Sequence, residues 1–273
     1  MSPGSDPRMR TRTPISVTFL LALSALYGGC QRDPAVDAAS TSVAPAHYTE
    51  AVARSTRAAD DREQDAGRKP AEVLEFFGIS PGMRVLDLYA GGGYYTELLS
   101  YVVGPSGSVV AHTNSPYLSF VGERFNARLE HNRLPNVEVL IAENNELELP
   151  AETFDAVLMI LCYHDIYYSN PANGWAKIDG PRLLAELYGA MKPGAVLGIV
   201  DHHAETGAPR ETGGTVHRID PGIVIAELEA AGFAVEEKSN ILRNMDDDYG
   251  KNVFDPAVRG KTDRFVLSFR KPG

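Results

Sequence analysis

The chain has little cysteine, since only Cys30 and Cys162 occur among its 273 residues. A small secreted domain that relies on disulfides carries several cysteine pairs, and this chain could form one bridge at most. Apolar residues make up 44% of the sequence, which is enough for one sizeable core at this length. The sequence therefore predicts a fold held by apolar packing and not by a disulfide scaffold.

Positive charge is also scarce, because 26 lysines and arginines stand against 36 aspartates and glutamates, for a net charge of −10. No block of basic residues interrupts this excess of acid. Nucleic-acid binding depends on clustered lysine and arginine at the phosphates. The composition therefore argues against a nucleic-acid substrate and favours a small molecule, with a protein as the alternative acceptor.

The sequence has no apolar run long enough to span a membrane. Its clearest apolar run is the 13-residue stretch at residues 15–27. A membrane-spanning helix needs about 20 such residues, whereas a signal-peptide core is shorter and follows basic residues. Arg8, Arg10 and Arg12 precede the run, and LYGGC at residues 26–30 resembles a lipoprotein cleavage box. We expect a signal peptide at residues 1–29, a flexible tether at 30–46 and one folded domain at 47–273.

This leader predicts an exported protein on the periplasmic side, anchored to the membrane through an acylated Cys30. Ordinary signal cleavage nearby and a retained, uncleaved anchor are the alternatives. The oligomeric state is not predicted.

Apolar runs that alternate with helical stretches organise the rest of the chain. Runs that are apolar on both faces and separated by helices are typical of a doubly wound, mostly parallel sheet of the α/β class. The strands predicted from this pattern lie at residues 84–88, 108–112, 137–142, 154–161 and 195–200.

The most informative stretch is RVLDLYAGGGY at residues 84–94, where an apolar run ends in an acid and glycines before a helical segment. Glycines let the backbone approach a ligand, and the unpaired N–H groups at a helix start attract negative charge. The order of strand, tight turn and helix therefore indicates a site for a nucleotide-like cofactor.

The segment from Asp87 to Gly93 resembles the first motif of class I S-adenosylmethionine-dependent methyltransferases, with Tyr89 where the first glycine is usual. The resemblance runs from about Lys69 to Phe269 and is closest to a bacterial group of exported predicted methyltransferases. It implies a seven-stranded, Rossmann-like methyltransferase fold, with the last two strands at residues 233–237 and 264–270, and S-adenosylmethionine as the cofactor. It also implies methyl transfer to an acceptor that the sequence does not identify.

Ligands of open α/β sheets bind outside the carboxyl ends of the strands, so the residues after each predicted strand are candidates. After the second strand the acid that usually holds the ribose is replaced by Asn114. The resemblance implies the following cofactor-binding residues: Asp87, Tyr89, Gly91, Gly93, Asn114, Glu143 and Asn144.

Imidazoles and carboxylates follow the fourth and fifth strands, at His164-Asp165 and at Asp201-His202. We expect His164, Asp165 and His202 to be catalytic, with His164 or Asp165 as the base that deprotonates the acceptor. The alternative is that these side chains only bond backbone at the strand ends.

Two further features bear on the site. The two imidazoles and two carboxylates of His164-Asp165 and Asp201-His202 could hold a transition metal. No His-x-x-x-His spacing or cysteine pair supports one, so no metal is predicted. His217 and Arg218 follow a glycine-rich loop at residues 207–214, which predicts a lid whose basic residues could orient an anionic acceptor.

Three functions remain open from the sequence. The first is an S-adenosylmethionine-dependent methyltransferase. The second is a non-catalytic ligand-binding protein on the same fold. The third is a metal-assisted hydrolase.

Overall fold

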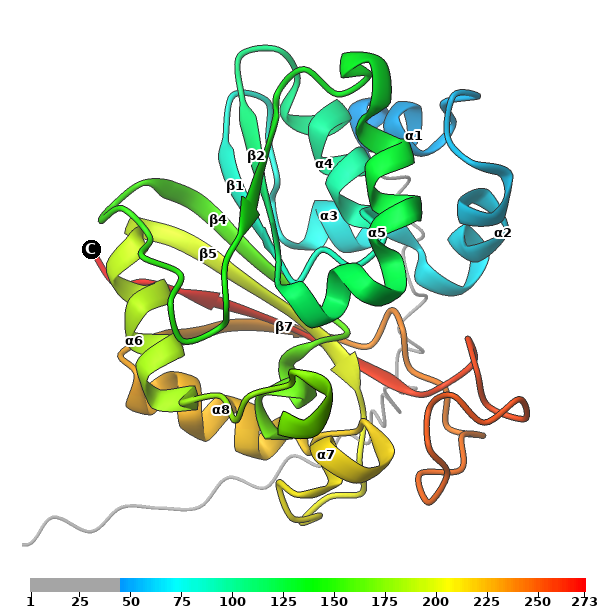
Figure 1. Ribbon diagram of the computed structural model, residues 1–273, viewed down its shortest axis with the longest axis vertical. Coiled ribbons are helices and arrows are strands. Elements are labelled where there is room, and N and C mark those ends of the chain that lie inside the picture. The colour runs from blue at the N-terminus through cyan, green and yellow to red at the C-terminus, as the bar shows by residue number, and fades with distance from the viewer. Residues whose placement is uncertain (1–44) are drawn as a thin grey trace, which may run out of the picture. The chain divides into compact units, whose positions relative to one another are not determined.

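A computed structural model describes residues 45–273 (Figure 1). The predicted signal peptide and nearly all of the predicted tether lie outside the described residues. Cleavage and acylation at Cys30, export and membrane attachment therefore stay predictions. Within residues 45–273, no helix combines the length and the apolar character needed to cross a bilayer.

One seven-stranded sheet has the order β3-β2-β1-β4-β5-β7-β6. Its first five strands run parallel, and β7 runs antiparallel to both β5 and β6. The predicted doubly wound, mostly parallel fold is thus confirmed. The strands are β1 (Arg84–Leu88), β2 (Ser108–Thr113), β3 (Val137–Ile141), β4 (Phe154–Ile160), β5 (Met191–His202), β6 (Ala234–Ser239) and β7 (Arg264–Arg270).

Helices cover both faces of the sheet. Figure 1 shows α3 and α4 on one face and α6 and α8 on the other, and each pair packs on its own apolar cluster. The α-helices are α1 (Ala46–Val52), α2 (Ala59–Arg68), α3 (Pro70–Phe76), α4 (Tyr94–Val103), α5 (Ser115–Leu129), α6 (Gly180–Ala190), α7 (Thr212–Val216) and α8 (Pro221–Ala230), and the 3-10 turns are η1 (Glu130–Asn132), η2 (Tyr163–Tyr167) and η3 (Pro171–Asn173).

The strand order explains why the site lies at β1. Val85 faces the cluster under α3 and α4, while Leu86 and Leu88 face the cluster under α6 and α8, so β1 is buried on both faces. β1 pairs with β2 on one side and β4 on the other, which places the strand-order reversal beside Asp87. A sheet of this type leaves a crevice at that point, above the carboxyl ends of the strands.

Candidate active site

A cavity of about 940 Å³ opens at the carboxyl ends of β1, β4 and β5. Its walls come from α2, the turn after β1, α5, η2, the end of β5 and the loop between β6 and β7. Of the predicted residues, the structure brings Asp87, Tyr89, Gly91, His164, Asp165 and His202 to this cavity. Aromatic side chains make much of the remaining wall, namely Tyr94, Tyr95, Tyr117, Phe120, Tyr168, Trp175 and Phe254.

The turn after β1 is left-handed at three positions. The φ angles are 55° at Tyr89, 57° at Gly91 and 78° at Gly93. Glycine is usual at such positions because a side chain makes them costly, by about 1–2 kcal/mol. Tyr89 keeps this backbone conformation, and its ring packs near those of His112 and Tyr117, with centroids 5.3 and 5.9 Å away. The departure at Tyr89 therefore changes the side chain and not the shape of the turn.

His112 joins the ends of three strands beneath that turn. Its Nδ1 accepts a hydrogen bond from the Tyr89 N–H at 3.3 Å, so its Nε2 carries the proton and donates to the Ala142 carbonyl at 3.0 Å. Burial lowers the pKa of His112 to about 4, which keeps the ring neutral. His112 is thus a buried structural residue that fixes the turn.

Arg128 of α5 holds the glycine turn from outside the motif. Its Nε donates to the Gly92 carbonyl at 2.8 Å, and its other nitrogens pair with Glu97 and with Asp61, the latter at 2.7 Å. All three charged side chains are almost completely buried. A Cβ at Gly93 would lie 2.9 Å from Cδ of Arg128, so this approach requires glycine there. Nothing in the sequence spacing points to this contact.

Asp87 is a buried carboxylate at the floor of the cavity. It is 3% exposed, and its Oδ2 accepts a hydrogen bond from the Thr96 hydroxyl at 2.6 Å. Burial raises the pKa of Asp87 to about 6, although Thr96 and Arg128 act in the opposite direction. A buried carboxyl that borders a cavity and has a raised pKa is a candidate for a functional residue.

A second cavity of about 140 Å³ follows the ends of β2 and β3 and shares Trp175 with the larger one. The predicted residues Asn114, Glu143 and Asn144 line it. The Asn114 side chain caps α5 by accepting from the Tyr117 N–H at 2.9 Å, and it donates to Asn144 at 3.1 Å. Its amide is therefore committed to the protein. The Glu143 carboxylate accepts one hydrogen bond, from the Ser115 N–H at the start of α5, at 3.3 Å.

His164 lies between two carboxylates. Its Nδ1 is 2.7 Å from Asp201 and its Nε2 is 3.3 Å from Asp165. Burial alone would lower the pKa of His164, but the two carboxylates outweigh it and raise the pKa to about 9. His164 is thus protonated at neutral pH, and this argues against its predicted role as the base.

Asp165 and His202 complete the predicted catalytic set. Burial acts to raise the pKa of Asp165, but the charge of His164 and the contacts with His217 and Tyr117 hold it below its usual value. Burial and the neighbouring charge of His164 hold the pKa of His202 well below its usual range. The cavity therefore presents one cationic ring, one carboxylate and one neutral ring.

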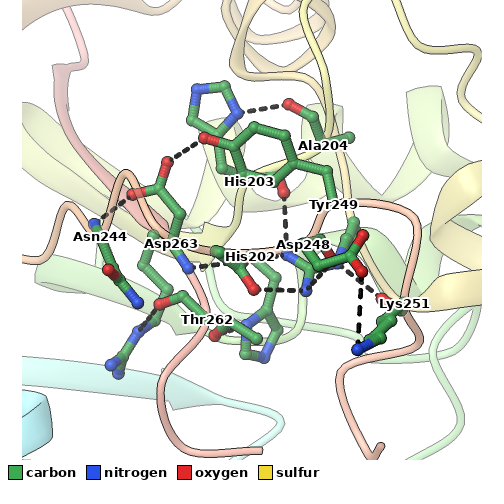
Figure 2. A network of polar contacts seen from close by, with 12 residues as sticks. His202, His203, Ala204, Asn244, Asp248, Tyr249, Lys251, Thr262 and Asp263 are labelled. Carbon is green, nitrogen blue, oxygen red and sulfur yellow. Dashed lines mark hydrogen bonds and ion pairs between the residues drawn. The ribbon is translucent and has the colours of Figure 1, made fainter. Parts of the chain in front are cut away.

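The loop at residues 240–263 closes the wall of the cavity next to His202. Figure 2 shows its anchor, Asp263, which accepts from the Tyr249 hydroxyl and the Asn244 N–H, each at 2.7 Å. Thr262 lies 2.7 Å from Nδ1 of His202. Because these bonds tie the loop to the end of β5, Val253, Phe254 and Gly260 reach the cavity.

Arg218 does not reach an acceptor, contrary to the expectation for this residue. Its side chain is fully buried and pairs with Asp247, which is equally buried, at 2.6 Å. The predicted lid is also tightly packed, because a Cβ at Gly213 would lie 2.6 Å from the His164 carbonyl oxygen. Only His217 of this segment lines the cavity.

Residues 47–166 match the family model described as protein-L-isoaspartate(D-aspartate) O-methyltransferase. The ubiquinone/menaquinone biosynthesis C-methyltransferase UbiE of Pseudomonas fluorescens is 29% identical over 137 residues, which cover 50% of this chain and 48% of the relative. UbiE of Hahella chejuensis is 28% identical over 49% of each chain. The chain thus spans about half the length of these relatives.

Two solved structures show the same fold over more of the chain. A SAM-dependent methyltransferase from Aquifex aeolicus is 26% identical with a TM-score of 0.53, over 76% of this chain and 98% of that one. A protein from Galdieria sulphuraria described as a putative sarcosine dimethylglycine methyltransferase superposes with a TM-score of 0.54 at 15% identity, over 78% and 88%. Together with the glycine turn and the strand order, these similarities show the fold of the class I S-adenosylmethionine-dependent methyltransferases and support the assignment of the chain to that class.

Proposed function

We propose that this chain binds S-adenosylmethionine and transfers its methyl group to a small-molecule acceptor. The observation that carries the proposal is the left-handed turn from Tyr89 to Gly93, which borders the same cavity as His164 and Asp165. A cofactor at the turn would thus lie beside polar groups suited to hold an acceptor. When bound, S-adenosylmethionine supplies an electrophilic methyl group on a positively charged sulfur.

The residues of the site fit such a cofactor. Asp87 offers a carboxylate to a positively charged amino group. The Tyr89 hydroxyl is buried without a hydrogen-bond partner among residues 45–273, although such groups are normally paired, and a ligand in the cavity could supply one. The small cavity next to the larger one offers amide and carboxylate groups from Asn144 and Glu143 to a ribose or a base.

Glu143 would take the part of the acid that is absent after β2, because its carboxylate accepts from the Ser115 N–H at the start of α5, just beyond that strand. A carboxylate that accepts two ribose hydroxyls makes stronger bonds than a neutral amide. We expect Glu143→Gln to weaken S-adenosylmethionine binding by about tenfold, since charge-assisted bonds contribute about 1.5–3 kcal/mol. Calorimetric titration of both variants checks this, with Glu123→Gln on the exposed side of α5 as the control. Equal affinity for wild type and Glu143→Gln would remove this assignment.

The acceptor half of the cavity combines aromatic walls with the charged set at its floor. Tyr117, Tyr168 and Trp175 pack edge to face around it, which suits a planar or apolar acceptor. His164 and His202 would orient the reacting group, and the Asp165 carboxylate would accept its hydrogen bond. Catalysis would rest mainly on this positioning.

Transfer is tested by incubating the full chain with S-adenosylmethionine that carries a labelled methyl group and a panel of small hydroxyl and amine acceptors. We expect labelled product with at least one acceptor, and a rate about 100-fold lower for Asp165→Asn, since groups that assist proton transfer contribute on this order. An unchanged rate for Asp165→Asn would contradict the role of Asp165. Bound cofactor without product from any acceptor would point to the ligand-binding alternative.

A further inference from the structure

We propose that Nε2 of His164, Oδ1 of Asp165 and Nδ1 of His217 bind a divalent transition-metal ion. Ligand atoms from these three residues lie within 4.8 Å of one another at the floor of the cavity. The set combines η2 with the residue that follows α7, and two imidazoles with one carboxylate. This inference concerns the ion alone and stands whether or not the cavity binds S-adenosylmethionine.

The distances fit an ion better than direct contacts. Oδ1 of Asp165 is 3.3 Å from Nε2 of His164 and 3.6 Å from Nδ1 of His217. A charge-assisted hydrogen bond between such atoms is about 2.7–2.9 Å long. Ligands that surround a tetrahedral ion at about 2.1 Å lie about 3.4 Å apart, which is close to both of these distances.

The outer contacts of these ligands are those that a metal site requires. Nδ1 of His164 bonds to the fully buried Asp201 at 2.7 Å, which turns Nε2 toward Asp165. The other oxygen of Asp165 accepts the Tyr117 hydroxyl. Such hydrogen-bond partners fix the orientation of the ligand side chain and leave the lone pair of its metal-binding atom free. Their loss commonly weakens metal binding 10- to 100-fold.

Charge supports an ion at the same place. Asp165 and Asp201 are two buried carboxylates on opposite sides of the His164 ring. A divalent ion would displace the proton from His164, and on two neutral imidazoles it would balance both carboxylates, so that the group carries no net charge. Buried charges are costly unless they are paired or bind a metal.

The ligand set also indicates which ions would bind and what they would hold. Two nitrogens and one oxygen suit zinc, cobalt, iron or manganese rather than calcium. Three protein ligands with a cavity beside them leave a coordination position open, as in catalytic sites. An oxygen atom of a small molecule in the cavity could take that position.

Cobalt is the probe for the test, because Co²⁺ changes its visible spectrum when nitrogen ligands bind it. The full chain is treated with chelator, dialysed and titrated with Co²⁺. The test variant is His217→Asn, and the control is His131→Asn. Both histidines hold a left-handed backbone, with φ of 57° and 56°, which asparagine tolerates, and His131 lies outside the cavity lining.

We expect one equivalent of Co²⁺ to bind to the wild type and to His131→Asn, with visible absorption bands. His217→Asn should bind at least about tenfold more weakly. No spectral change in the wild type, or equal affinity in His217→Asn, would overturn the proposal. Titrating the same proteins with S-adenosylmethionine separates the two proposals, because cofactor binding at the glycine turn should survive in His217→Asn.

Discussion

Replacing Arg128 by methionine is expected to lower the free energy of unfolding by about 3–5 kcal/mol, as when one partner of a buried ion pair is lost. Glu97 and Asp61 would keep only the partly exposed Arg133 and Arg124 as partners, and the Gly92 carbonyl would lose its donor. Urea unfolding followed by circular dichroism measures the loss. Because Arg128 also holds the glycine turn, cofactor affinity should fall in the protein that remains folded.

Arg133→Met provides the matched comparison. Arg133 also contacts Glu97, at 3.0 Å, but its side chain is one-third exposed. Exposed ion pairs contribute about 0–1 kcal/mol, so this variant should lose much less stability. A cost below about 1 kcal/mol for Arg128→Met would show that the turn keeps its shape without this arginine.

Asp87→Asn is expected to make the protein more stable at neutral pH and to weaken cofactor binding at the same time. The folded protein raises the pKa of Asp87 to about 6, so its ionisation opposes folding. The difference from the ordinary value of about 3.9 corresponds to about 3 kcal/mol at full ionisation. Asparagine removes this cost and can still accept the Thr96 hydroxyl.

The sign of the pH dependence follows from proton binding. Between about pH 4 and pH 6 the folded state holds a proton on Asp87 that the unfolded state has released, so this residue contributes less stability as the pH rises. The difference in unfolding free energy between wild type and Asp87→Asn should therefore change through this window and level off above it. A pH-independent difference would contradict the raised pKa. Unchanged affinity for S-adenosylmethionine in Asp87→Asn would remove its cofactor-binding role.

The fold was largely predictable because it depends on local signals. Five of the predicted strands are apolar runs, and the last two follow from the family resemblance. Each lies within a few residues of its observed position. The largest difference is β5, which begins at Met191 rather than near residue 195, because it continues through Pro193 and Gly194 with a shift in register against β4. The residues at this irregular start do not form an apolar run, so the sequence did not predict them as part of the strand.

The site was predictable only where it follows strand ends. His164, Asp165 and His202 reach one cavity because neighbouring parallel strands end at the same edge of the sheet. Arg128 could not be found in this way, since it acts on the turn from the far end of α5. The charge states of His164 and His202 depend on carboxylates and burial that only the folded chain brings together.

Arg218 and Asp247 form a second contact that the sequence does not reveal. Each looks like an exposed polar residue in the sequence, one beside a glycine-rich loop and the other in an acidic run. In the fold they form a fully buried ion pair that fixes the loop at residues 240–263. Partners that lie far apart in the sequence carry no local pattern.

The most direct test of the account is a calorimetric titration of the full chain with S-adenosylmethionine and with its demethylated product. The account predicts binding of both with micromolar affinity, weakened in Asp87→Asn and in Glu143→Gln and unchanged in Glu123→Gln. Absence of binding heat from both compounds, confirmed by equilibrium dialysis with labelled S-adenosylmethionine, would contradict the central claim that the turn from Tyr89 to Gly93 holds this cofactor.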